Sequence, residues 1–221
     1  MRHTLDVKNL SKNFKEQVVF SEVSMRFESG RIYGLIGRNG SGKTVFLKCI
    51  CGFIHADTGE IWLDDRKLGE NMEYLDDCGF LIERPGFMED LSGRENLKYI
   101  ASIRKIAGAD RIMECMEQVG LDPGDKKHVS KYSMGMKQRL GVAQAIMENP
   151  SILILDEPMN GLDDNGVVLM RKLLLGLRNQ GKLILISSHY MEDIQLLCDK
   201  VYRFRNGCVE PFVFVDSPRH C

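Results

Sequence analysis

Residues 37–44 have the types and spacing that bind phosphate. They are Gly37, Arg38, Asn39, Gly40, Ser41, Gly42, Lys43 and Thr44, which match the pattern G-x-x-x-x-G-K-[ST]. Its glycines let backbone N–H groups point at a phosphate chain without a Cβ in the way, and a helix that begins there adds its positive dipole end. We expect Lys43 to reach the β and γ phosphates and the Thr44 hydroxyl to bind Mg²⁺. The pattern therefore predicts a nucleotide site.

A pair of carboxylates forms the second group with a chemical use. Asp156 and Glu157 follow the apolar run 152–155, which predicts a strand buried on both faces. Ligands of open α/β sheets bind at the carboxyl ends of such strands. We expect Asp156 to hold Mg²⁺, directly or through water, and Glu157 to polarise the water that attacks the γ phosphate. A solvated acidic turn is the alternative, and the phosphate-binding pattern in the same chain argues against it.

Four further residues have both a chemical and a structural interpretation. Ser133 and Gly135 stand at a predicted helix start, where free N–H groups and a hydroxyl make a second phosphate site, although serine is also an ordinary N-cap there. His189 follows a predicted strand, where a lone histidine is more often structural. Phe14 lies in a predicted polar turn, where an aromatic ring either packs locally or stacks on a flat base.

Hydrophobic periodicity predicts the strands that position these residues. Residues 3–9 and 23–28 alternate, which indicates antiparallel strands joined by a turn near 13–17. The apolar run 32–36 predicts a strand that enters the phosphate-binding loop, and 45–51 a helix that leaves it. Further strands are predicted in a short hairpin around 61–63 and at 78–82, 152–155, 183–186, 201–204 and 208–215.

Helical periods appear in the middle of the chain. A capping-box pattern at 92–95 opens a helix that we expect to end near Gly108. Apolar stripes at 112–119 and 136–147 predict two more helices, so residues 86–149 form a helical insertion between strands. A crossover helix at 170–177 should end at Gly181, and another should follow His189. The fold class is therefore α/β, with an N-terminal antiparallel β portion and an inserted α-helical subdomain.

Composition excludes several classes of function. The chain has 30 basic and 31 acidic residues, a formal charge of −1, so we expect no nucleic-acid partner. It has no apolar run long enough to cross a bilayer and no apolar core of a signal peptide near its start, so we expect no direct membrane insertion. Seven cysteines without C-x-x-C spacing indicate a reducing cytoplasm.

Taken together in their order, these motifs resemble the ATP-binding subunit of an ABC transporter. Residues 37–44 match the family's Walker A motif, 152–157 match Walker B, and 133–136 occupy the place of its LSGGQ signature. Residues 159–163 resemble the D-loop, which contributes Asp163, and 187–189 resemble the switch-histidine segment. The wording of residues 132–140 is similar to the bacitracin-export and lantibiotic-immunity branch.

This resemblance implies a fold, a cofactor and partners. The fold is a P-loop NTPase sheet core, and residues 1–221 make one ABC ATPase domain, with its sheet core at 1–85 and 150–221 and its helical subdomain at 86–149. It implies that ATP and Mg²⁺ bind, that His189 contacts the γ phosphate and that Phe14 stacks on adenine. Two ATPs would lie between two cassettes, expected to be identical copies, with residues 133–136 facing the partner's Walker A. A separate membrane permease would hold the chain on the cytoplasmic face of the cell membrane.

The sequence departs from the family pattern at two places. Glu83 stands where the family has a glutamine that touches Mg²⁺ and couples to the membrane subunit; a carboxylate binds the metal more strongly but adds negative charge near the phosphates. In the signature, Met134 and Met136 replace a glycine and a glutamine. Contacts to ATP would then rely on Ser133, Gly135 and backbone N–H groups.

Two other function classes agree less well with these motifs than transport does. A soluble ABC-type ATPase acting on nucleic acid or ribosomes usually carries tandem cassettes or long coiled-coil insertions, whereas this chain has one motif set and a compact insertion. A P-loop kinase or GTPase does not explain residues 133–135 or His189. We therefore expect an enzyme that hydrolyses ATP to drive transport through a separate permease, and no regulatory domain after the last strand.

Overall fold

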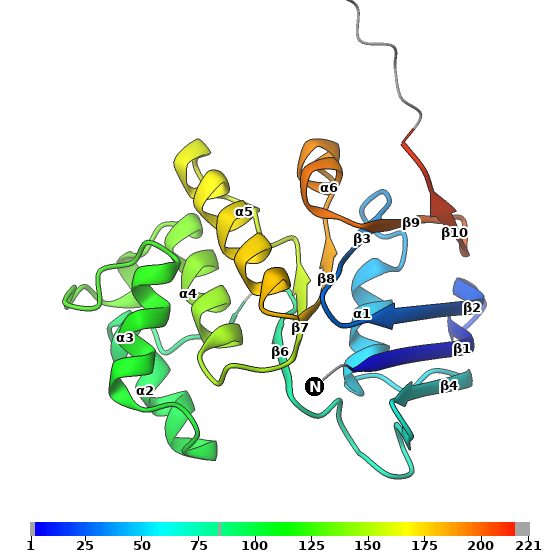
Figure 1. Cartoon of the computed structure of the whole chain (residues 1–221), viewed down its shortest axis with the longest axis horizontal. Coiled ribbons are helices and arrows are strands. Elements are labelled where there is room, and N and C mark those ends of the chain that lie inside the picture. The colour runs from blue at the N-terminus through cyan, green and yellow to red at the C-terminus, as the bar shows by residue number, and fades with distance from the viewer. Residues whose placement is uncertain (1–2, 84, 215–221) are drawn as a thin grey trace, which may run out of the picture.

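A computed structural model describes residues 3–83 and 85–214 of the chain. Within these residues the strands form two sheets, one of four strands in the order β2-β1-β4-β5 and one of six in the order β10-β9-β3-β8-β7-β6. Figure 1 shows α2, α3 and α4 together at one end of the molecule and β1, β2 and β4 at the other, with β3, β7 and β8 between them. The α/β class with helices inserted between strands is confirmed.

The six-stranded sheet is built around three short parallel strands. These are β3 (Ile32–Ile36), β7 (Ile152–Asp156) and β8 (Leu183–Ser187), and every residue in them is buried. The flanking strands are β6 (Cys78–Leu81), β9 (Lys200–Arg205) and β10 (Cys208–Phe212). Parallel strands covered on both faces need apolar side chains on both, which explains their continuous apolar runs. β10 ends at Phe212, so the strand predicted over 208–215 is wrong at residues 213 and 214, and Val215 lies outside the described residues.

Alternate residues of these strands enter two separate cores. Ile32, Leu153 and Ile184 pack in one core with residues of α4 and α5, whereas the next residue in each strand packs in the other. That second core includes Phe46 and Ile50 of α1 and the inner face of the N-terminal sheet. The central strands are thus held from both sides, which fixes the edge at which they end.

The N-terminal sheet contains β1 (Thr4–Phe14), β2 (Gln17–Glu28), β4 (Thr58–Leu63) and β5 (Arg66–Lys67). β1 and β2 are antiparallel, and their turn confirms the one predicted near 13–17. Both strands are longer than predicted because their register shifts between Val7 and Asn13. Such irregularities break the strict alternation by which a strand is recognised. Trp62 packs in the predicted hairpin, with Lys8 and Lys67 over its ring.

The helices follow the predicted order, with one boundary wrong. They are α1 (Lys43–Cys51), α2 (Gly93–Arg104), α3 (Ala109–Gln118), α4 (Met134–Ile146), α5 (Asp164–Asn179) and α6 (Met191–Leu197), with a 3₁₀ turn at Val129–Lys131. The capping box at the start of α2 is confirmed, since Ser92 and Glu95 satisfy each other's backbone N–H groups. Its expected end near Gly108 is wrong, because Lys105 adopts a left-handed conformation with φ 57° and closes the helix at Arg104.

Candidate functional site

Most of the predicted residues meet at the edge where the central parallel strands end. Leu35 of β3 and Asp156 of β7 each lie opposite Ser187 of β8. The segments that follow these strands therefore leave the sheet side by side. They carry the phosphate-binding loop, the two carboxylates and His189.

The phosphate-binding loop has the backbone that its glycines predict. Gly40 and Gly42 have φ 77° and 102°, which side chains other than glycine rarely adopt. A Cβ at Gly42 would lie 2.9 Å from Val19 Cγ1, so this position also has no room for one. Within the described part of the chain, α1 starts at Gly42 with no side-chain cap. Its first N–H groups are thus available to an anion.

Two buried polar groups of this loop suit a phosphate. Lys43 is 5% exposed, and its Nζ donates to the carbonyl oxygens of Gly37 at 2.8 Å and Arg38 at 3.3 Å. Ser41 Oγ is buried and has no hydrogen-bond partner among the described residues. A buried hydroxyl without a partner costs free energy unless a ligand satisfies it. The loop therefore fits the phosphate chain that its sequence predicts.

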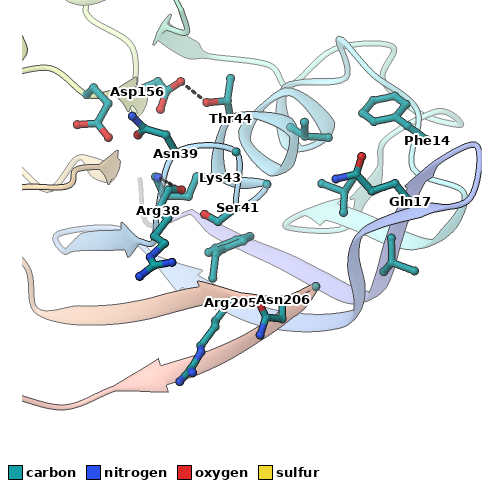
Figure 2. A pocket seen from close by; sticks show the side chains of 18 residues that line it. Phe14, Gln17, Arg38, Asn39, Ser41, Lys43, Thr44, Asp156, Arg205 and Asn206 are labelled. Atoms are coloured by element: carbon teal, nitrogen blue, oxygen red, sulfur yellow. Dashed lines mark hydrogen bonds between the residues drawn. The ribbon is translucent and has the colours of Figure 1, made fainter.

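A pocket of about 690 Å³ opens over this loop. It brings together Phe14, residues 38–44, Asp156 and Glu157. Figure 2 shows Phe14 and Asp156 at opposite ends, with Lys43 and Ser41 of the loop between them. An elongated ligand with a flat group at one end and phosphates at the other fits this arrangement.

Asp156 is held at the inner end of the pocket by two hydroxyls. Thr44 Oγ1 donates to Asp156 Oδ2 at 2.7 Å, the contact drawn in Figure 2, and Ser187 Oγ donates to Oδ1. Asp156 is 8% exposed and Ser187 is fully buried. A hydroxyl and a carboxylate oxygen side by side are hard oxygen ligands of the kind Mg²⁺ takes alongside phosphates. Thr44 and Asp156 therefore fit the metal role predicted for them.

Glu157 and His189 touch although 32 residues separate them. His189 Nδ1 lies 2.8 Å from Glu157 Oε2, and the His189 backbone N–H donates to the same oxygen at 3.3 Å. Glu157 has φ 52°, a left-handed conformation that is strained for a residue with a side chain. Its backbone is held by Ser187 Oγ, which accepts from its N–H, and by Gln138 Nε2, which donates to its carbonyl at 2.8 Å.

Phe14 stands at the outer end of the pocket on a braced strand end. The Asn13 N–H and Lys12 Nζ both donate to the Asp57 carboxylate, at 2.6 and 2.7 Å. The hydrogen bond from Lys12, followed by that from the Asn13 backbone, lowers the pKa of Asp57. Lys12 Nζ also lies 5.3 Å from the centre of the Phe14 ring. Phe14 is 47% exposed, so a face of this ring is accessible to a ligand.

The signature residues lie elsewhere. Of the described residues that line the pocket, none belongs to 133–136. Ser133 caps α4 and accepts from the Met136 N–H at 3.2 Å, which confirms the N-cap interpretation. Gly135 packs against the D-loop so closely that a Cβ would lie 2.6 Å from the Gly161 carbonyl oxygen. Asp163 caps α5, and its Oδ1 accepts a hydrogen bond from Arg139 Nη2 at 2.7 Å. The structure thus joins the signature to the D-loop and not to the phosphate loop of the same chain.

Three other predicted residues also lie outside the main pocket. Gly37 and His189 line a neighbouring one beside the β9–β10 turn. Glu83 lies just past β6, where its carboxylate pairs with Lys48 of α1 at 2.6 Å.

Sequence reasoning missed part of the pocket wall. Gln17, Val18 and Val19 of β2 line it, as do Arg205, Asn206 and Gly207 of the β9–β10 turn. The Ser21 N–H donates to the Gly207 carbonyl at 2.9 Å, which joins the two segments. Asn206-Gly207 is a recognisable turn pattern, but nothing in its spacing connects it to the phosphate loop.

Comparison with known proteins agrees with this geometry. The family model described as ABC transporter matches residues 20–160. The ABC transporter ATP-binding protein YybJ of Bacillus subtilis, which is itself uncharacterised, is 40% identical over 93% of this chain and 94% of its own length. The bacitracin transport ATP-binding protein BcrA of Enterococcus faecalis is 39% identical over 94% of this chain and 68% of its own length. The lantibiotic transport ATP-binding protein SrtF of Streptococcus pyogenes is 34% identical, over 88% and 84%.

Solved structures share the fold. The ATP-binding subunit of an ABC transporter superposes with a TM-score of 0.83 at 28% identity, over 93% of this chain and 87% of the other. The dimeric ABC transporter cassette MJ0796 gives the same TM-score at 24% identity, over 93% and 96%. Since the family model covers more than half of the chain and the relatives cover nearly all of it, this chain belongs to the ABC transporter family, as one of its ATP-binding cassettes, which are ATPases.

Proposed function

We propose that this chain binds and hydrolyses MgATP as a dimerising subunit that drives transport through a separate membrane permease. The observation that carries the proposal is the meeting of Thr44, Asp156, Glu157 and His189 at one sheet edge, beside a phosphate-binding loop. Adenine would stack on Phe14, and residues 37–44 would hold the phosphates. Residues 1–221 would act as one cassette, with the helices of 86–149 as its subdomain.

Thr44 and Asp156 would hold Mg²⁺. A bound ion would neutralise the negative charge that develops on the phosphate oxygens during the reaction. The Thr44 hydroxyl now donates to Asp156, so its oxygen lone pairs remain free for a metal. Ser187 keeps the other Asp156 oxygen in place, which aims the carboxylate at Thr44. The Glu83 carboxylate is paired with Lys48. We therefore propose that Glu83 affects this metal through its negative charge and not as a direct ligand.

Glu157 would position the attacking water. Its carboxylate would take a proton from that water as the oxygen bonds to the γ phosphorus and the bond from phosphorus to the bridging oxygen breaks. ADP leaves with the bridging oxygen, and the proton passes from Glu157 to the phosphate that is released. His189 contacts Glu157, which supports a role in orienting this carboxylate. Its other ring nitrogen would donate to a γ phosphate oxygen. Loss of that phosphate would break the contact, and His189 would then report hydrolysis to α6.

A second cassette would complete the site. Ser133 and Met134 are exposed, lie outside the pocket of their own chain and stand beside the D-loop. An exposed N-terminus of α4 is suited to a phosphate that another chain presents. The partner's 133–136 would therefore face residues 37–44, most simply in a homodimer.

The helical subdomain would contact the permease. Between β6 and α2 lies a groove of about 210 Å³ whose apolar walls include Phe80, Ile103 and Ile106, all exposed. Exposed apolar patches of this kind mark protein contacts. In the described part of the chain, no helix is both long enough and apolar enough to span a bilayer. We propose that a permease partner holds the protein on the cytoplasmic face of the membrane, as the transport proteins among its relatives suggest.

Purification from membranes tests this proposal. Tagged chain from its own cells, extracted with detergent, should bring down a multi-span membrane protein and hydrolyse ATP in that complex. Recovery with ribosomes or DNA alone would instead support the soluble ATPase. The formal charge of −1 and the transport proteins among the relatives give that alternative no support.

A further inference from the structure

Lys48 and Glu83 form an ion pair, and Lys48 lies one turn of α1 after Thr44, which lines the main pocket. Lys48 Nζ donates to Glu83 Oε1 at 2.6 Å, across 35 residues of sequence. The Lys48 side chain is 24% exposed and that of Glu83 is 61% exposed. Exposed pairs contribute little to stability, so stability alone does not account for this contact.

The pair lies at an edge crowded with carboxylates. β6 and β7 are parallel neighbours, with Leu81 opposite Leu155. Glu83 comes two residues after Leu81, past the end of β6, and Glu157 comes two residues after Leu155, just past the end of β7, so both acids follow the same edge of the sheet as Asp156. Nucleotide phosphates would add more negative charge here. Asp156 is bound by the Thr44 and Ser187 hydroxyls and Glu157 by His189, whereas the partner of Glu83 is the positive charge of Lys48.

Helix α1 connects this pair to the metal position. Lys48 follows Thr44 by four residues, so the two side chains lie on one face of the helix. Thr44 contacts Asp156 at the end of β7, and Lys48 contacts Glu83 just past the end of β6. Adjacent side chains of α1 thus hold two neighbouring strand ends.

The loop that carries Glu83 is also fixed on its other side. A Cβ at Gly141 of α4 would lie 2.7 Å from Leu81 Cδ1 and 3.1 Å from Pro85 Cγ, so α4 packs closely against this loop. Glu83 itself has φ 61°. The loop therefore runs between α1, which the nucleotide would touch, and the helix that begins with the signature.

We propose that Lys48 is a positioning residue: it holds the Glu83 carboxylate against α1 and offsets its charge, so that this charge does not oppose the bound phosphates. The proposal rests on the nucleotide site proposed above. It predicts that the effect of removing Lys48 depends on the presence of the Glu83 charge.

Calorimetry with the magnesium complex of a non-hydrolysable ATP analogue tests this coupling. Lys48→Met keeps a side chain of similar length and removes its charge. It should weaken binding of the analogue about fivefold, the order expected when one unpaired charge acts on the phosphates in a partly solvated site. In a Glu83→Gln background the same substitution should change affinity less than about twofold. Lys48→Arg should bind like the unaltered chain. Because the effect is electrostatic, the fivefold loss should shrink at high salt.

Matched controls separate the possible failures. Lys98→Met, on the exposed face of α2, should leave affinity unchanged, and thermal melting should show every variant folded. If Lys48→Met caused the same loss in the Glu83→Gln background as in the chain that keeps Glu83, the proposal would be overturned, as it would be by no loss at all. If the unaltered chain does not bind the analogue, the proposed nucleotide site itself is wrong.

Discussion

Glu157 and His189 are brought into contact although no local sequence motif joins them. Glu157 is strained at φ 52°, and its backbone is held by Ser187 and Gln138. The imidazole and the backbone N–H of His189 meet the same carboxylate oxygen. Strain that persists because surrounding contacts determine it is typical of functional sites.

Glu157→Gln should nearly abolish turnover while nucleotide still binds. The amide keeps the size of the side chain but cannot accept a proton, so ATPase activity should fall by at least about a hundredfold, the usual contribution of a general base. Steady-state phosphate release measures this. Glu117→Gln, the same change on the exposed face of α3, should retain activity. Near-normal hydrolysis by Glu157→Gln would remove Glu157 from the mechanism.

Lys43→Ala should weaken nucleotide binding itself. Its ammonium is buried among carbonyl oxygens of the loop, and a lost charge-assisted hydrogen bond to phosphate costs about tenfold or more in affinity. Calorimetry with ATP and Mg²⁺ should show this, whereas Lys98→Ala should bind normally. Unchanged affinity would contradict the assignment of residues 37–44 as a phosphate cradle.

At the level of elements, helix starts carry much of the architecture. α2, α4 and α5 begin at Ser92, Ser133 and Asp163, each of which accepts from a backbone N–H of the first turn. The N-cap of α1 is Gly42, and the structure describes no side-chain cap there. The helices α3 and α6 also begin without a side-chain cap, at Gly108 and Tyr190, but of these three helices only α1 has its first residues in the main pocket. The N–H groups of α1 are thus the ones placed to bind phosphate.

Ser92→Ala should lower the free energy of unfolding by about 1 kcal/mol, because it removes the side-chain cap of α2. Urea denaturation monitored by circular dichroism measures this. Ser102→Ala, an exposed serine near the end of the same helix, serves as the control. A loss as large in the control would show that the cap is not the cause.

The same capping box should make stability depend on acid. Hydrogen bonds from the Ser92 hydroxyl, and then from its backbone N–H, lower the pKa of Glu95. A carboxyl whose folded pKa is lowered stabilises the fold above its unfolded pKa, and this contribution disappears as the pH falls through the folded value. Glu95→Gln still accepts the hydrogen bonds but does not titrate there. The variant should therefore lose less stability than the unaltered chain on acidification below about pH 4.3.

For the whole molecule, the separation of the signature from the pocket has a physical consequence. Gly135 packs on Gly161, and Asp163 accepts a hydrogen bond from Arg139 of α4. The signature and the D-loop are therefore joined to each other. None of these residues lines the pocket over the phosphate loop. Under the proposed function, a dimer has two ATP sites. Each chain contributes its phosphate loop to one site and its signature to the other.

ATP should therefore dimerise Glu157→Gln, since binding without turnover would hold the closed state. Light scattering after size exclusion should show the mass double when ATP and Mg²⁺ are added. Adding Ser133→Arg places a long charged side chain at the exposed start of α4 and should keep the chain monomeric, whereas Ser102→Arg should not. A dimer that forms equally well with Ser133→Arg would argue against the signature as its contact.

The sequence by itself determined the fold class, the phosphate-binding loop and the carboxylates after β7, because these depend on periodicity and on residues close together in the chain. Only the tertiary structure decided which distant groups meet. Thr44 finds Asp156, Glu157 finds His189, and Lys48 finds Glu83 through strand order and register, which no local pattern encodes. The sequence predicts the phosphate loop itself, whereas the packing of β2 and the β9–β10 turn against it forms the rest of the pocket wall.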